Sequence, residues 1–200
     1  MRKTILLVFA LLMAFAASGC SYNDLTDKQQ KVKGKWANVE STLQRRADLI
    51  PNLVKAAQMA GIQEQEVFGQ IADARSRLLN ATKDSDGDKT PEQKQAVMEA
   101  NQSLGTALGR LLVLQENYPV LRSNESFMKL MDELSGTENR INTARTDYNK
   151  AVQEYNTARN SFPAVITASL MGFKEEPYFQ AEEGSRQAPT LPDPNSMRRN

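Results

Sequence analysis

The side chains of this sequence that are able to carry chemistry are few in kind. Among its 200 residues there is one cysteine, Cys20, and no histidine. A Ser–His or Cys–His nucleophile pair cannot be built from this chain. A Cys/His zinc site and an internal disulfide are excluded for the same reason. Chemistry would therefore fall to Cys20, to the carboxylates and arginines, or to the aromatic side chains.

The single cysteine ends a segment with the layout of an export signal. Arg2 and Lys3 precede an apolar run over residues 5–17, and small residues follow before Cys20. This order of basic, apolar and small residues is typical of a secretory signal. The run is shorter than the roughly 20 residues that a spanning helix needs, so a plain transmembrane anchor is the poorer interpretation.

The cleavage region also indicates a modification of Cys20. Ala17-Ser18-Gly19-Cys20 resembles the lipobox of bacterial lipoproteins, although Ala17 stands where Leu is usual. The resemblance implies that the thiol receives a lipid and becomes the new N-terminus, and two or more acyl chains anchor a protein stably. The alternative is that Cys20 is an ordinary buried thiol. In Gram-negative cells Ser21 favours the outer membrane, facing the periplasm.

The composition suits one domain between two terminal segments. We expect a signal peptide over residues 1–19, a helical domain over 20–173 and an extended or disordered tail over 174–200. Without the signal the chain has 23 basic and 24 acidic side chains. This balance gives no reason to expect a nucleic-acid partner.

One charged residue falls on an apolar track. Arg46 stands among hydrophobic residues spaced seven apart, and a charge on a buried seam needs a partner. If the first and last helices run antiparallel, we expect Arg46 to meet Glu138. The alternative is that both side chains extend to the solvent.

The remaining acidic residues form no recognisable site. Asp84, Asp86 and Asp88 resemble the start of a calcium loop, but Gly87 comes too early and Gln95 replaces the bidentate Glu. No metal or other cofactor is therefore expected. A paired-acid site built from Asp48, Glu116 or Glu138 is an alternative that no spacing singles out.

The elements that position these residues are predicted to be helices. The spacing of the apolar residues favours an all-α fold, an up-and-down antiparallel bundle of long helices. Over residues 124–162 a large apolar residue recurs every seven positions, from Phe127 to Phe162, and Pro163 ends the element. A second helix is expected to begin with a capping box at Thr90.

The N-terminal half is also seven-periodic, and its register survives Pro51 and Gly61. This predicts one long helix kinked near Pro51, or two nearly collinear helices. A reversal at Gly61, which could end a helix, is the alternative.

Near the C-terminus, residues 164–173 read as a short apolar helix that caps the bundle. The aromatic residues Phe173, Tyr178 and Phe179 follow. They are either an exposed docking patch or, as such residues more often are, a clamp that holds the tail on the bundle.

Several segments, in order, resemble the LemA family over about residues 22–190. They include residues 44–53 (QRRADLIPNL), 116–119 (ENYP), 136–141 (GTENRI), the repeated Tyr-Asn pairs at 148 and 155, 172–174 (GFK) and 177–179 (PYF). The resemblance implies an up-and-down bundle tethered at its N-terminus to a bacterial membrane, and no established reaction. Many LemA-like chains carry a transmembrane helix there, where this chain has the lipobox-like segment.

These observations predict a non-enzymatic scaffold or binding protein of the cell envelope. Its expected partners are the lipid bilayer, through acylated Cys20, and another envelope or membrane protein. The alternatives are a carboxylate-dependent hydrolase of envelope material and an accessory subunit of a membrane enzyme.

Overall fold

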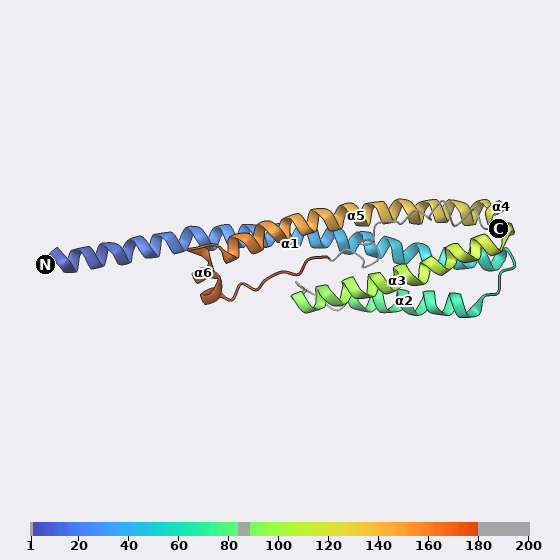
Figure 1. Ribbon diagram of the computed structural model, residues 1–200, viewed down its shortest axis with the longest axis horizontal. Coiled ribbons are helices and arrows are strands. Elements are labelled where there is room, and N and C mark those ends of the chain that lie inside the picture. Colours follow the sequence, from blue (N-terminus) through green and yellow to red (C-terminus); the bar gives the residue numbers. More distant parts are fainter. Residues whose placement is uncertain (1, 84–88, 180–200) are drawn as a thin grey trace, which may run out of the picture.

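The structure is a computed structural model that describes the backbone of residues 2–83 and 89–179 and the side chains of residues 21–83 and 89–179. The described residues form helices and no strand, so the predicted all-α class is confirmed (Figure 1). The helices are α1 (Arg2–Met59), α2 (Gln65–Lys83), α3 (Pro91–Asn117), α4 (Pro119–Ser123), α5 (Glu125–Asn160) and α6 (Ala164–Met171). The aspartates of the calcium-like loop, residues 84–88, lie outside the described residues.

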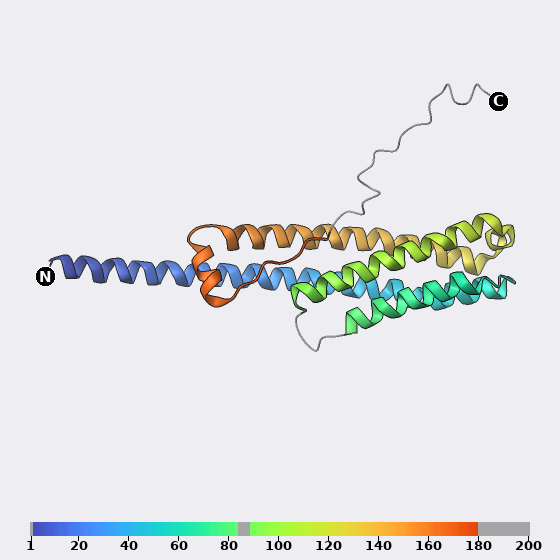
Figure 2. The ribbon, with the colours of Figure 1, turned by 60° about the horizontal axis from the view of Figure 1, so that its bottom comes forward.

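The two longest helices, α1 and α5, lie side by side along the molecule (Figures 1 and 2). Their surface ion pairs show that they run antiparallel, because Lys35 faces Asp147 at 2.8 Å while Arg45, further along α1, faces Glu133 at 2.7 Å. The hairpin of α2 and α3 packs along the second half of α1. The predicted up-and-down bundle is therefore observed.

The seven-residue spacing explains the core, because residues seven apart return to the same face of a helix. The expected tracks are buried in α1 and α5, and their buried members include Leu25, Val32, Val39, Leu53, Phe127, Leu134, Ile141, Tyr148 and Tyr155. The track fails at Phe162, whose side chain is 82 % exposed. That prediction was wrong because α5 ends at Asn160, before Phe162 can face the core.

Helix α1 continues through Pro51, although proline has no N–H to donate to the carbonyl of Ala47. Arg75 of α2 supplies the missing donor, since its Nε donates to the Ala47 carbonyl oxygen at 2.7 Å. Ala47 is fully buried, so without Arg75 this carbonyl would lack a partner in the core. The bend expected near Pro51 stays a prediction.

The chain reverses at Gly61, as the alternative interpretation proposed. Gly61 has φ +87°, its N–H donates to the Gln58 carbonyl, and the N–H of Ile62 donates to the Ala57 carbonyl. This pair of bonds is a Schellman motif, completed by the burial of Ile62. Helix α2 then runs back along α1, so the prediction of one continuous helix or two collinear helices was wrong.

The other helix ends follow local signals in the sequence. Thr90 and Gln93 form the predicted capping box at the start of α3. Tyr118 and Pro119 turn the chain into α4, and Asn124 caps α5 by accepting from the N–H of Phe127. After α5 the short helix α6 ends at Gly172, whose φ is +74°. The chain then turns back along the bundle in an extended conformation (Figure 1).

Candidate functional site

The most elaborate polar arrangement in the described residues holds residues 173–179, which we call the docked segment. Side chains of α5 donate hydrogen bonds to its carbonyls. Tyr155 Oη donates to the Lys174 carbonyl at 2.8 Å and Tyr148 Oη to the Pro177 carbonyl at 3.0 Å. Arg159 Nε donates to the Phe173 carbonyl at 2.9 Å.

Two asparagines complete the attachment with paired hydrogen bonds. Asn156 donates to the carbonyl of Glu176 at 2.9 Å and accepts from its N–H at 3.0 Å. Asn149 makes the same pair with Phe179, at 3.0 and 2.8 Å. Seven helical residues rise about 10 Å, and three extended residues span nearly the same length. The repeated Tyr-Asn pairs of α5 therefore match the repeat of an extended chain.

The phenol groups of Tyr148 and Tyr155 stay protonated at ordinary pH, as hydrogen-bond donors must. Burial, with the nearby charge of Glu176, raises the pKa of Tyr148 well above its usual range. The same two causes raise the pKa of Tyr155 to about 12. Both side chains therefore keep the O–H that binds the docked segment.

A buried ion pair lies between the docked segment and α3. Lys94 Nζ and Glu176 Oε2 are 2.7 Å apart, and their side chains are only 3 % and 8 % exposed. The ammonium also lies 5.6 Å from the centre of the Trp36 ring and 5.9 Å from that of Tyr148. This pair was not predicted from the sequence. A signal was available, since Lys94, Asn101 and Leu108 stand seven apart on a buried face of α3.

The structure places the three residues of the predicted aromatic patch differently. Phe179 is buried. Its ring centre lies 5.9 Å from that of Trp36, in a stacked arrangement, and 5.8 Å from that of Tyr148, in an edge-on arrangement. Phe173 is half-buried, with its ring 5.8 Å from that of Tyr22, and Tyr178 is 42 % exposed. Phe179 therefore clamps the chain, as the alternative interpretation held, and an exposed patch of all three rings is not observed.

A pocket of about 450 Å³ lies between α1, the start of α3 and the docked segment. Its charged side chains belong to Lys33, Glu40, Lys89, Lys94, Lys174 and Glu176. Each carboxylate faces a lysine, because Glu40 Oε1 is 3.7 Å from Lys89 Nζ and Glu176 is bound to Lys94. Charge neutralisation of this kind holds segments together, and it does not provide the two coupled carboxyls of a hydrolase.

Arg46 and Glu138 are brought together, with Nη2 and Oε2 at 3.1 Å. Arg46 is 7 % exposed, and its Nη1 donates to Asn101 of α3 at 2.8 Å. The guanidinium also packs against α3 near Gly105, where a Cβ would lie 3.6 Å from Arg46 Nη2, an ordinary van der Waals contact. The guanidinium thus joins α1, α3 and α5.

The other acids named as catalytic candidates are apart from this pair. Asp48 of α1 and Glu116 of α3 are exposed, and Asp48 accepts a hydrogen bond from Gln44. A general acid would need a raised pKa. Where the pKa of a described carboxyl departs from its usual value, it is lowered, as at Asp147 and Glu154, which accept hydrogen bonds from Lys35 and Lys31. In the described part of the chain no three Cys, Asp or Glu side chains gather to hold a metal ion.

Cys20 belongs to α1, two residues before Tyr22 and close to where the bundle begins at Leu25. Its side chain lies outside those described. Over the described residues, none of the helices combines the length and apolar character needed to cross a membrane.

Comparison with known proteins gives matches over most of this sequence. Residues 35–192 match the LemA family. Magnetosome proteins MamQ 1 and MamQ 2 of Paramagnetospirillum magneticum are each 32 % identical over 175 residues, which cover 80 % of this chain and 64 % of theirs. Magnetosome protein MamQ of Magnetospirillum gryphiswaldense is 30 % identical over 174 residues, covering 79 % of this chain and 64 % of its own. This chain thus spans under two thirds of these relatives. The family match and the ordered motifs together show that the chain belongs to the LemA family.

Proposed function

We propose that this protein is a lipid-anchored, non-enzymatic binding protein of the bacterial cell envelope. Acylated Cys20 holds one end of the bundle at the membrane, and the helices carry the other end away from it. The observation that supports this most directly is the place of Cys20 in α1, next to the end where the bundle begins.

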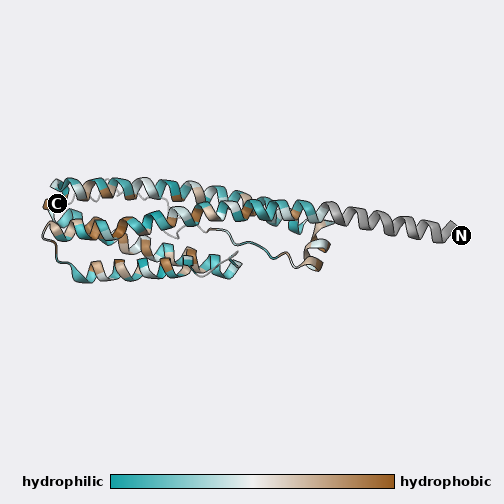
Figure 3. Cartoon of the chain, turned by 180° about the vertical axis from the view of Figure 1, so that it is seen from behind, coloured by the Kyte–Doolittle hydropathy of each residue, from teal (hydrophilic) through white to brown (hydrophobic). Residues whose placement is uncertain are grey.

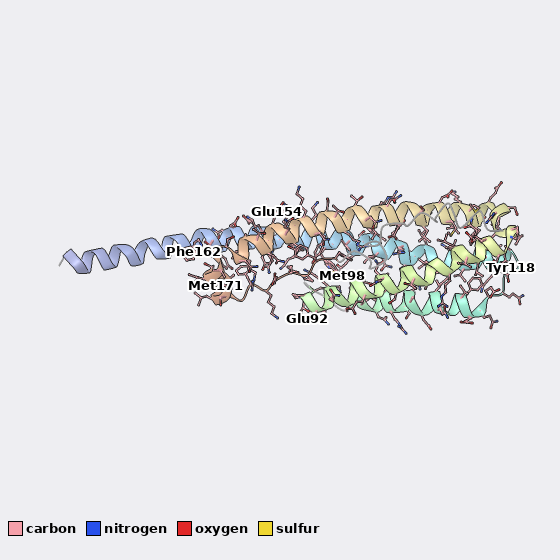
Figure 4. All side chains as sticks on the ribbon, in the orientation of Figure 1. Glu92, Met98, Tyr118, Glu154, Phe162 and Met171 are labelled. Carbon is pink, nitrogen blue, oxygen red and sulfur yellow. The ribbon has the colours of Figure 1, made fainter. Side chains whose placement is uncertain are left out.

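The bundle has two distinct ends. Figure 4 shows Phe162 and Met171 at the end from which α1 projects, and Tyr118 at the opposite end. From Tyr22 to Met59, α1 rises roughly 55 Å at 1.5 Å per residue. The turns at Gly61 and Tyr118 would therefore lie roughly 55 Å from the bilayer, where they could contact a partner. Leu112 and Val113 are more than half exposed near this distal end.

The anchor is tested on protein from the native host. Intact mass and N-terminal peptides of the membrane fraction are expected to show acylated Cys20 as the first residue. Cys20→Ala should remove the acyl mass and release the protein from carbonate-washed membranes, whereas Ser21→Ala should do neither. A mature protein that begins upstream of Cys20 without acyl mass would refute the anchor.

Binding is tested separately by crosslinking in intact membranes. A photo-crosslinking residue at Val113 is expected to recover a specific envelope protein, and the same residue at exposed Arg77 of α2 serves as a matched control. If no specific protein is recovered, or Arg77 recovers the same set, the scaffold role is contradicted even with the anchor in place.

A further inference from the structure

Helix α6 exposes its large apolar side chains, which is unusual for a helix in contact with water. The side chains it buries are small or polar, with Ala168 2 % and Thr167 7 % exposed. The large apolar ones point outward, with Ile166 53 %, Leu170 78 % and Met171 63 % exposed. A surface helix normally buries its large apolar side and exposes its polar side. An outward apolar face therefore indicates a contact with something apolar.

The chain around α6 extends this face and carries no charge. Between Arg159 and Lys174 there is no Asp, Glu, Lys or Arg. Phe162, just before α6, is 82 % exposed, and Val165 within it is 40 % exposed. In Figure 3 the ribbon of α6 has the white-to-brown colours of uncharged and apolar residues. The uncharged segment thus exposes several large apolar side chains, both before and within α6.

This surface lies at the level of the proposed anchor. Helix α6 packs on α1 and α5 at the end of the bundle from which α1 projects (Figures 1 and 4). The ring of Phe173, directly after α6, contacts the ring of Tyr22 at 5.8 Å. Tyr22 is two residues from Cys20, which is about 3 Å along the helix axis. A lipid on Cys20 would therefore bring α6 to the bilayer surface.

We propose that α6 is a second membrane contact, whose exposed apolar side inserts into the interface of the bilayer beside Cys20. This inference rests on the proposed anchor. A helix of 8 residues is about 12 Å long, so it lies in the interface and does not cross the membrane. Tyr22, 44 % exposed at the same level, has the amphipathic ring that favours the headgroup region.

The inference is tested on the complete mature protein with its native lipid, reconstituted in vesicles of phosphatidylethanolamine and phosphatidylglycerol. A spin label is attached at Leu170→Cys, because acylation leaves no other thiol. The control is Val113→Cys, an apolar position that is also more than half exposed and lies at the distal end. Collision with oxygen reports lipid, and collision with a water-soluble nickel chelate reports solvent. We expect the label at 170 in lipid and the label at 113 in water.

A second measurement separates this inference from the anchor. Mature chain carrying Cys20→Ser has no lipid, and its vesicle partitioning is expected to fall at least tenfold when Ile166→Asp and Leu170→Asp are added. Circular dichroism checks that these variants fold as the parent does. Equal partitioning of the folded variants, or a label at 170 in water while Cys20 is acylated, would overturn the inference and leave the anchor standing. Unacylated Cys20 with binding that depends on α6 would refute the anchor alone. In the absence of vesicles, the protein could instead form dimers in which the label at 170 is shielded from both oxygen and the nickel chelate. That result would show that a second copy of the chain covers the exposed side of α6, and it would overturn the inference.

Discussion

The most decisive test of the fold concerns the carbonyl of Ala47. Pro51 deprives it of its helical donor, and Arg75 Nε donates to it instead at 2.7 Å. Arg75→Met keeps the apolar part of the side chain and removes the donor. A buried acceptor left without a partner costs about 1–3 kcal/mol, so we expect a loss of about 2 kcal/mol in the free energy of unfolding.

The same substitution should be nearly harmless when Pro51 is replaced. Pro51 is exposed, so Pro51→Ala adds no steric conflict and restores an N–H that can donate to Ala47. With that donor present, Arg75→Met should cost no more than the ~0.5 kcal/mol of an ordinary surface change. The double-mutant cycle should therefore give a coupling of at least ~1 kcal/mol between two residues that lie on different helices.

The assay is denaturant unfolding followed by far-UV circular dichroism, with the four proteins of the cycle measured at one temperature and pH. Arg77→Met, at an exposed position of the same helix, is the matched control and should leave the stability unchanged. An equal loss from Arg75→Met in the parent protein and in the Pro51→Ala variant would show that Arg75 stabilises the protein in some other way. The explanation of how α1 passes Pro51 would then be refuted.

Three further predictions follow from the polar contacts. Lys94→Met leaves the buried Glu176 unpaired and should lower the free energy of unfolding by about 3–5 kcal/mol, and adding Glu176→Leu should recover much of that loss. Equal stability of the single and the double variant would contradict this prediction. Lys31→Met, which breaks an exposed ion pair, is the control. Arg46→Leu should lower the free energy of unfolding by about 1–3 kcal/mol, because the buried side chain of Asn101 loses its hydrogen-bond donor. Glu138→Gln should lower it less. Unchanged stability in both variants would show that Arg46 and Glu138 do not stabilise the bundle. Since the pKa of Tyr155 rises from 10.0 unfolded to about 12 folded, its contribution to stability is complete below pH 10.0 and is lost as the pH rises to about 12. Tyr155→Phe should flatten the fall in unfolding free energy over that alkaline range, and an unaltered pH profile would refute the assignment.

The class of fold and most of its core could be predicted from the order of the residues. Residues repeated every seven positions must face one side of a helix, so the burial of Leu25, Val39, Ile141 and Tyr148 follows from spacing alone. Local signals also placed the cap at Thr90 and the end of α5 before Pro163, because capping depends on neighbours within a single turn.

The place where the chain reverses and the partners of its polar side chains depend on how the helices pack. The apolar period continues across Gly61 in either a straight or a reversed chain, and the choice depends on whether α2 can pack on α1 and supply Arg75 to Ala47. The pairing of Lys94 with Glu176 joins residues 82 positions apart, for which no local pattern exists. The outward face of α6 was likewise hidden, because its composition resembles that of a buried helix. Burial depends on which neighbours surround a segment, and this is a property of the folded chain.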